Sequence, residues 1–425
     1  MMKINWSGFS KKTYPERLKT LRDSELLSHE LQENLEKNET LSVAIADQLS
    51  ENVVGTFSLP FSIVPEVIVN NQAYTVPYVT EEPSVVAAAS FACKIINRSG
   101  GFSAYVHQRL MIGQVALYQV PDREQACQEI LNQKDQLLKI ANQAYPSIVK
   151  RGGGARELRV EKVSGQTDFL VVYLHVDTQE AMGANMLNTM LEALKPHLES
   201  LSRGQSLMGI LSNYATESLV TSSCRIAFHY LSPNKDEARE LANKIVLASH
   251  FAQADPYRAA THNKGIFNGI DALLIATGND WRAIEAGAHA YASRDGLYRG
   301  LSLWTLDSEK EELIGEMTLP MPIATKGGSI GLNPRVVLSH ELLGQPSAKD
   351  LAQIIVSMGL AQNFAALKAL VGTGIQQGHM KLQAKSLALL AGAKEAEVPK
   401  LVEGLIAEKT FNLEKAKSIL KALRS

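Results

Sequence analysis

The chain has 425 residues, of which 45% are hydrophobic and 20% are charged, and its formal net charge at pH 7 is −1. This length is sufficient for two or three domains, and the composition is typical of a soluble globular protein. The near-zero charge argues against nucleic acid and against an anionic membrane surface as partners, because both attract strongly basic proteins.

The cysteines and the apolar segments indicate the cellular compartment. Cys93, Cys127 and Cys224 are odd in number and have no paired spacing, which excludes a disulfide framework and a zinc knuckle. We expect buried thiols in a reducing compartment and no metal centre. The N-terminus has no apolar signal segment, and the most apolar windows, such as 84–92 and 387–393, are too short to span a bilayer. The sequence therefore predicts a soluble, cytoplasmic protein.

The first hundred residues predict short helices, then strands, then one further helix. Residues 12–50 have leucines at helical spacing among charged residues, and 53–79 consists of apolar stretches interrupted by proline. Glu81 and Glu82 stand directly before Pro83, and a run of alanine and serine follows. Proline is favoured at the first helical position, so we expect a helix to begin at Pro83. Its small residues indicate that something approaches this helix closely.

Residues 110–213 predict a self-contained unit with the order β-α-β-β-α-β, which is the split βαβ arrangement of ferredoxin-like folds. Residues 111–120 alternate like a strand, 123–144 has the pattern of a long amphipathic helix, and a hairpin is expected around Gly165 and Gln166. The expected elements are a strand over 111–120, a helix over 123–144, strands over 157–163 and 169–176, a helix over 183–202 and a strand over 207–212.

The following segment predicts a larger unit, so that the ferredoxin-like unit would be an insertion. The expected elements are a strand over 219–231, a helix over 236–252, a strand over 272–276, a helix over 281–292, a hairpin around 306–312, a helix near 351–371 and a helical tail over 374–425. Lys264, which Gly265 follows, is expected in a loop. We predict an α+β fold with a discontinuous large α/β domain around a central helix (1–109 and 215–373), a small domain (110–214) and a C-terminal helical flap (374–425).

Five motifs together resemble the signature of class II, bacterial hydroxymethylglutaryl-CoA (HMG-CoA) reductases. They are Glu81-Glu82-Pro83-Ser84, Glu180-Ala181-Met182-Gly183-Ala184-Asn185, Thr261-His262-Asn263-Lys264-Gly265, Ala276-Thr277-Gly278-Asn279-Asp280 and Gly374-Ile375-Gln376-Gln377-Gly378-His379. The resemblance covers about residues 51–390 and keeps the order of the family. It implies an NAD(P)H-dependent oxidoreductase that converts HMG-CoA to mevalonate and free CoA for isoprenoid synthesis.

The resemblance implies four catalytic residues. Reducing a thioester to an alcohol develops negative charge on the carbonyl oxygen and releases a thiolate, so a cation and proton donors are required. Lys264 would polarise the carbonyl group, and Asp280 would hold the lysine while capping the helix that follows it. Glu82, with Glu81 as the alternative, would exchange protons with the substrate oxygen. His379 would protonate the thiolate from a mobile flap.

The substrate and the cofactor are assigned to two further sets of residues by the resemblance. Substrate contacts would come from Ser84, Asn213, Arg258, Asn268 and, less strongly, Thr261, although Arg258 could equally form a surface ion pair. No G-x-G-x-x-G motif follows a strand, so the nucleotide would instead lie at the head of the helix over 183–202, where free N–H groups can donate hydrogen bonds to phosphate oxygens. The implied cofactor residues are Tyr145, Glu180, Met182, Gly183 and Asn185.

The choice of nucleotide depends on Tyr145. NADH-preferring relatives carry an aspartate at this position, whereas Tyr145 does not repel a 2′-phosphate and has Lys150 and Arg151 nearby. We therefore predict NADPH, with NADH as the alternative cofactor. The resemblance also implies at least a homodimer with shared active sites. Two other functions remain open, namely NAD-dependent oxidation of mevalonate and non-catalytic binding of a CoA ester or nucleotide.

Overall fold

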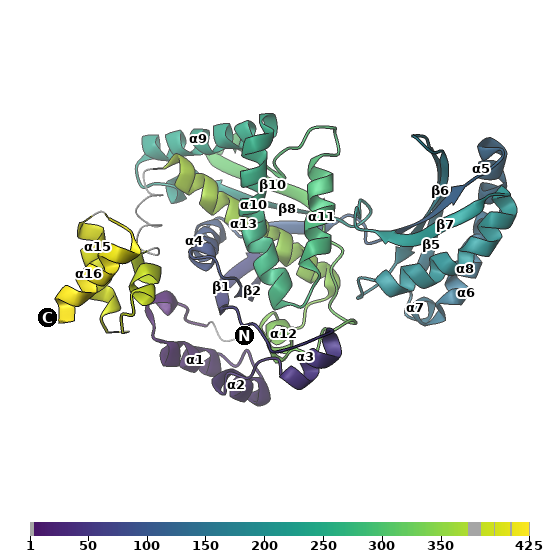
Figure 1. The fold of residues 1–425 in the computed structure, drawn as a ribbon. Helices are drawn as coiled ribbons and strands as arrows, with labels where there is room; N and C mark the ends of the chain where they lie inside the picture. The colour runs from purple at the N-terminus through teal and green to yellow at the C-terminus, as the bar shows by residue number, and fades with distance from the viewer. Residues whose placement is uncertain (1–3, 373–383, 395, 409, 425) are drawn as a thin grey trace.

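The computed structural model describes residues 4–372, 384–394, 396–408 and 410–424. It contains a six-stranded sheet with the order β2-β1-β3-β8-β10-β9 and a four-stranded sheet with the order β5-β6-β4-β7. These two sheets with their helices confirm the predicted α+β class. Figure 1 shows the four-stranded sheet and its helices at one side of the larger unit, and the C-terminal helices at the opposite side.

The larger unit is built on the six-stranded sheet. Asn70 and Asn71 join β1 to β2, and both have positive φ, as a two-residue hairpin turn with matching twist requires. β1 pairs with β3 in parallel, and the remaining neighbours are antiparallel. The strands are β1 (Phe61–Val69), β2 (Gln72–Val79), β3 (Phe102–Val106), β8 (Leu219–Ala227), β9 (Ser302–Asp307) and β10 (Glu312–Pro320).

The predicted central helix is α13 (Ala348–Val371), and it packs against α4, α10 and the sheet. Its 24 residues are long and apolar enough to cross a membrane, judged by length and composition alone. The expectation that every apolar window is too short was therefore wrong. Because 72% of the apolar window is buried within the protein, the apolar character of α13 is explained by its place in the core.

Four helices and two shorter ones surround α13 and the sheet. One prediction here was wrong: 272–276 is the end of a 21-residue helix, α10, rather than a strand, and Lys264 lies in that helix rather than in a loop. The side chain of Asp255 caps α10 at Arg258 N (2.7 Å), and the apolar residues of its last turns are buried on several sides. A short buried helical segment and a buried strand have the same apolar pattern. The helices are α4 (Val85–Asn97), η2 (Phe228–Tyr230), α9 (Lys235–Ala254), α10 (Pro256–Ala276), α11 (Trp281–Ala292) and α12 (Pro334–Leu342).

The start of α4 also differs from the prediction. Ser84 is the N-cap residue and has a left-handed backbone (φ 76°), so helical dihedrals begin only at Val85. Pro83 is therefore not the first helical residue, and Glu82 lies in the turn that precedes the cap.

The smaller unit has the predicted β-α-β-β-α-β order, and its sheet encloses a hydrophobic core of its own. The single helix predicted over 123–144 is two helices with a break at Gln133. None of residues 131–136 is buried, so packing does not hold the junction in a helical conformation. The elements are β4 (Met111–Tyr118), α5 (Arg123–Asn132), α6 (Lys134–Ala144), α7 (Pro146–Lys150), β5 (Gly154–Val163), β6 (Phe169–Asp177), α8 (Ala184–Ser202) and β7 (Gln205–Ser212).

Short helices lie at both ends of the described chain. The N-terminal ones confirm the prediction for 12–50, and the C-terminal ones, together with a helical stretch over 384–390, share a small separate core. They are η1 (Phe9–Lys11), α1 (Tyr14–Asp23), α2 (His29–Glu36), α3 (Val43–Leu49), α15 (Val398–Ala407) and α16 (Leu413–Arg424).

The three cysteines are free thiols. Cys93 and Cys224 are buried, as expected, whereas Cys127 is only half-buried. Burial raises the pKa of Cys93 to about 12 and also raises the pKa of Cys224, so neither thiol is reactive at neutral pH.

Candidate functional site

Lys264 and Glu82 form an ion pair at the surface of the larger unit. The Lys264 Nζ atom lies 2.5 Å from Glu82 Oε2, although the two residues come from α10 and from the turn before α4. The side chains are 59% and 41% exposed, so a ligand can reach both of them. An exposed pair of this kind contributes only about 0–1 kcal/mol to stability. The contact also distinguishes Glu82 from Glu81, for which no lysine contact is present within the described residues.

Four of the predicted site residues share one face of α10. Arg258, Thr261, Lys264 and Asn268 follow one another at spacings of three, three and four, which places them in a row along about 15 Å of the helix. The Arg258 guanidinium has no ion pair among the described residues, and its partial burial lowers its pKa. The row therefore presents, in order along the helix, the guanidinium group of Arg258, the hydroxyl group of Thr261, the ammonium group of Lys264 and the amide group of Asn268.

Gly265 leaves open space beside Lys264. A Cβ atom at this position would have no heavy atom of the described residues within 4 Å, so packing inside the protein does not require a glycine. Glycine inside a helix costs about 1 kcal/mol relative to alanine. Gly265 thus leaves the space free where a ligand would approach the ammonium group of Lys264.

Asp280 caps α11, as the sequence predicts. Its Oδ1 atom accepts a hydrogen bond from Ala283 N (3.1 Å) and lies 3.6 Å from the Arg282 guanidinium. The ion pairs of the described residues do not include a contact between Asp280 and Lys264. The fourth predicted catalytic residue, His379, lies outside the described residues.

Asn213 lies against the middle of α11, and Ser84 lies at the start of α4. The backbone oxygen of Asn213 packs against α11, since a Cβ atom at Gly287 would lie 2.3 Å from it. Ser84 is half-buried and is the N-cap residue of α4, two positions after Glu82. Neither side chain has a hydrogen bond within the described part of the chain, so both polar groups are available to a ligand.

The head of α8 has the geometry of a phosphate-binding site. Gly183 has φ 95°, and a Cβ atom there would lie 2.3 Å from Thr178 Cγ2, so a glycine is required. No side chain caps the helix at Gly183, which leaves its first N–H groups available to an anion. Met182 is half-buried and Asn185 is exposed.

Glu180 and Tyr145, the other two predicted cofactor residues, make contacts within the protein. The Glu180 carboxylate accepts hydrogen bonds from Thr325 Oγ1 (2.6 Å) and Ala348 N (2.8 Å), both in the larger unit. Tyr145 is half-buried against the core of the smaller unit, at the junction of α6 and α7. The loop between α7 and β5 packs on the end of β6, because a Cβ atom at Gly153 would lie 2.5 Å from Asp177 O.

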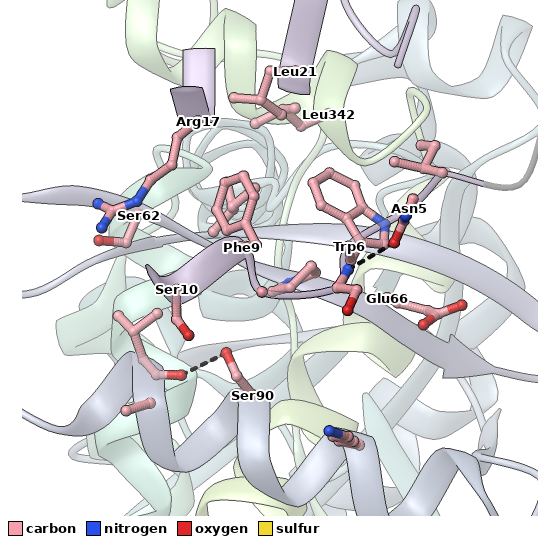
Figure 2. A pocket seen from close by; sticks show the side chains of 18 of the residues that line it. Asn5, Trp6, Phe9, Ser10, Arg17, Leu21, Ser62, Glu66, Ser90 and Leu342 are labelled. Atoms are coloured by element: carbon pink, nitrogen blue, oxygen red, sulfur yellow. Dashed lines mark hydrogen bonds between the residues drawn. The ribbon is translucent and has the colours of Figure 1, made fainter. Parts of the chain in front are cut away.

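A cavity of about 1080 Å³ lies along α4. The N-terminal segment, α1, β1 and α12 form its other walls, and Figure 2 shows Trp6 and Phe9 among the side chains that line it. Ala87 and Ser90 of α4 line it too, whereas Ala89 and Ala92 of the same helix are fully buried. Neither Lys264 nor Glu82 belongs to the lining, so the cavity and the ion pair are separate features.

Sequence reasoning missed an acidic pair on the two helices that carry Lys264 and Asp280. Asp271 lies seven residues after Lys264 on α10, and its burial together with Glu285 of α11 raises its pKa to about 8. The helical spacing from Lys264 would have indicated Asp271 if α10 had been predicted as one helix.

The fold and the site together define a class of protein. It is a two-sheet α+β enzyme in which a lysine and a carboxylic acid lie in contact at an accessible surface, as needed to polarise a carbonyl group and transfer a proton. The sequence model of the hydroxymethylglutaryl-coenzyme A reductase family matches residues 13–384, and the chain belongs to this family.

Individual relatives agree with this assignment. The chain is 76% identical to 3-hydroxy-3-methylglutaryl-coenzyme A reductase from Streptococcus pneumoniae, covering 99% of this chain and 100% of that one, with a TM-score of 0.87. A class II reductase structure from the same organism, bound to NADPH in open conformations, is 77% identical over 87% of this chain and 100% of that one, with a TM-score of 0.86. The reductase of Archaeoglobus fulgidus is 41% identical over 98% of this chain and 94% of its own length.

Proposed function

We propose that the protein reduces HMG-CoA to mevalonate and free CoA with two NADPH. The contact between Lys264 Nζ and Glu82 Oε2 is the observation that carries this proposal, because it joins a cation to a proton-transferring group where a ligand can reach both. Membership of the reductase family and the NADPH-bound relative support the substrate and the cofactor.

The chain's own residues would act on the thioester and then on the aldehyde. NADPH supplies the hydride in both reductions. In each, Lys264 would donate a hydrogen bond to the carbonyl oxygen and stabilise the negative charge that develops there, while Glu82 would deliver a proton to that oxygen. Between the two reductions Glu82 would take back the hydroxyl proton of the thiohemiacetal as the C–S bond breaks, and His379 would protonate the CoA thiolate that leaves. Arg258 and Asn268, on the same face of α10, would hold the carboxylate and hydroxyl groups of the substrate.

The same proposal includes the assembly and the location of the enzyme. We expect at least a homodimer with active sites shared between subunits. Residues 51–60 form neither helix nor strand and expose Val54 and Phe57 almost completely, and such apolar exposure is typical of an interface. A cytoplasmic location agrees with the three free cysteines.

The test is the loss of reduced-nicotinamide absorbance when purified protein is mixed with HMG-CoA and either NADPH or NADH. Turnover that depends on HMG-CoA and releases free thiol supports the reductase. Faster oxidation of mevalonate with NAD⁺ and CoA than reduction with NADPH would support the degradative direction instead. Folded protein that binds CoA esters without turnover in either direction would leave a binding protein.

Gly265→Ala is expected to stabilise the protein and to weaken substrate binding. Removing a glycine from the interior of a helix should raise the free energy of unfolding by about 0.5–1 kcal/mol. The added methyl group would occupy the open space beside Lys264, so the KM for HMG-CoA should rise several-fold. Urea unfolding and initial rates measure the two effects. Stabilisation without any change in KM would show that the space is not used by the substrate.

Tyr145→Asp is expected to change the nucleotide preference from NADPH toward NADH. A carboxylate beside the 2′-phosphate would cost about 1.4–2.8 kcal/mol, which corresponds to a roughly 10- to 100-fold fall in the ratio of kcat/KM for NADPH to that for NADH. Tyr145→Phe is the control, because it keeps the ring that packs on the core without adding a charge. Wild-type protein that prefers NADH would contradict the prediction for this position.

A further inference from the structure

A short segment of the larger unit, 323–325, contacts both the head of α8 and the residue before Asp280; we call it the connector. Arg109, in the link between β3 and β4, joins the connector to the turn that precedes α8. Its Nη2 atom donates to Ile323 O (2.5 Å) and to Ala181 O (3.1 Å), while Nε donates to Gln179 O (2.8 Å). One guanidinium group thus binds both units through three backbone carbonyl groups.

Glu180 makes the second attachment. Here the residue before α8 accepts hydrogen bonds that groups of the larger unit donate. Its carboxylate accepts from Thr325 Oγ1 and from Ala348 N at the start of α13, and its backbone oxygen accepts from Thr325 N (3.0 Å). Burial lowers the pKa of Arg109, and the charges of Glu180 and Asp177 oppose that shift. The two side chains therefore stabilise one another at the joint in addition to their hydrogen bonds.

Asn279 attaches the connector to the catalytic side. Its side chain donates to Ala324 O (3.1 Å) and accepts from Ala324 N (2.7 Å), so the amide pairs with the connector backbone in both directions. The next residue is Asp280, which caps α11. Hydrogen bonds therefore run without interruption from the turn before Gly183, through the connector, to the residue beside Asp280.

We propose that Arg109, Glu180 and Asn279 are positioning residues that hold the nucleotide-binding head of α8 at a fixed position relative to Asp280, at the start of α11. This inference rests on the proposed function. It assigns Glu180 a role through the connector instead of a contact with the cofactor, because both of its carboxylate partners belong to the larger unit. Hydride transfer is sensitive to such placement, since a displacement of about 1 Å can lower the rate about 100-fold.

The test compares Arg109→Met, Arg109→Lys and Glu180→Gln with the wild-type enzyme in the full chain. Arg109→Met removes all three donors while keeping a long side chain, and we expect kcat to fall roughly 10- to 100-fold. Because the head of α8 itself stays intact, the Kd for NADPH, measured by nicotinamide fluorescence, should change less than about threefold. Arg109→Lys should restore part of kcat, and the double variant Arg109→Met/Glu180→Gln should lose less than the product of the two single losses.

Arg225→Met is the matched control, because Arg225 is an exposed arginine that pairs with Glu312 at 2.9 Å on β8, and it should keep wild-type kcat and Kd. Weaker NADPH binding with unchanged kcat would overturn the positioning role and place Glu180 or Arg109 in the cofactor site. Lower thermal stability with kcat and Kd both unchanged would overturn it in favour of a structural role. If Arg109→Met does not fold, Glu180→Gln decides by the same two readouts. Inactive wild-type protein would refute the proposed function itself, which separates the two failures.

Discussion

Replacing Lys264 with alanine is expected to lower kcat for HMG-CoA reduction at least 10²–10³-fold, while the thermal midpoint changes by no more than a degree or two. The loss of one oxyanion donor typically costs this much, and Lys264 supplies a full positive charge in addition to a hydrogen bond. Stability should change little because the ion pair with Glu82 is exposed to solvent. The same exposure means that the variant should fold, so that the lost activity can be attributed to the chemistry.

Lys244→Ala provides the matched control for this prediction. Lys244 is also an exposed helical lysine with a carboxylate partner, at 2.6 Å from Glu240, but it lies on α9 and away from the predicted site residues. It should retain wild-type turnover. Rates measured under saturating HMG-CoA and NADPH separate loss of catalysis from loss of binding. A Lys264→Ala enzyme that kept more than a tenth of wild-type kcat would contradict the role of the lysine.

A sequence motif points to Lys264 as a catalytic residue, yet the sequence led to the wrong local structure for it. Gly265 and Asn263 are weak helix formers, which is why a loop was expected. Contacts with distant residues hold the helix instead: Asn263 pairs with Arg299 O and Leu301 N, and Gly269 packs against the backbone of α13 at Met358. Tertiary packing of this kind overrides local propensity and has no signal within a short window.

The smaller unit was predicted more accurately because local patterns determine it. Its first strand alternates with period two, its two middle strands flank a turn at Gly165 and Gln166, and its helices carry apolar residues at helical spacing, so the β-α-β-β-α-β order follows from short windows. The joint around Arg109 could not be found in this way. Arg109 reaches backbone carbonyls that are 70 and 214 residues away, and those acceptors are the same in every residue type.

The acidic pair of Asp271 and Glu285 leads to a prediction about stability and pH. Burial and the neighbouring Glu285 raise the pKa of Asp271 to about 8 in the folded protein, whereas an aspartate in an unfolded chain has a pKa of about 3.9. The folded state therefore binds more protons than the unfolded state between these values. Stability contributed by the protonated carboxyl is fully present below about pH 4 and is lost as pH rises through about 8.

Asp271→Asn is expected to remove this loss, because an amide is neutral at every pH and can still hydrogen-bond to Glu285. Each pKa unit corresponds to about 1.36 kcal/mol. After partial solvent screening, we expect the free energy of unfolding of the variant, relative to wild type, to be on the order of 2–4 kcal/mol higher at pH 9 than at pH 5. Calorimetric melting at both pH values measures this difference as an upward shift of the melting temperature that is several degrees larger at pH 9 than at pH 5. Asp47→Asn, an exposed position on α3, is the control and should show no such difference.

The effect of Asp271→Asn on stability at the two pH values tests directly whether Asp271 is protonated between α10 and α11. A variant that is destabilised equally at pH 5 and pH 9 would mean that Asp271 is ionised in the folded protein and accepts hydrogen bonds that an amide cannot replace. A gain that is larger at pH 9 than at pH 5 would mean that Asp271 keeps its proton in the folded protein at neutral pH, between the helices that carry Lys264 and Asp280. Ionisation of Asp271 at alkaline pH would then weaken the packing of α10 against α11, because burial disfavours the charged form of its carboxyl group.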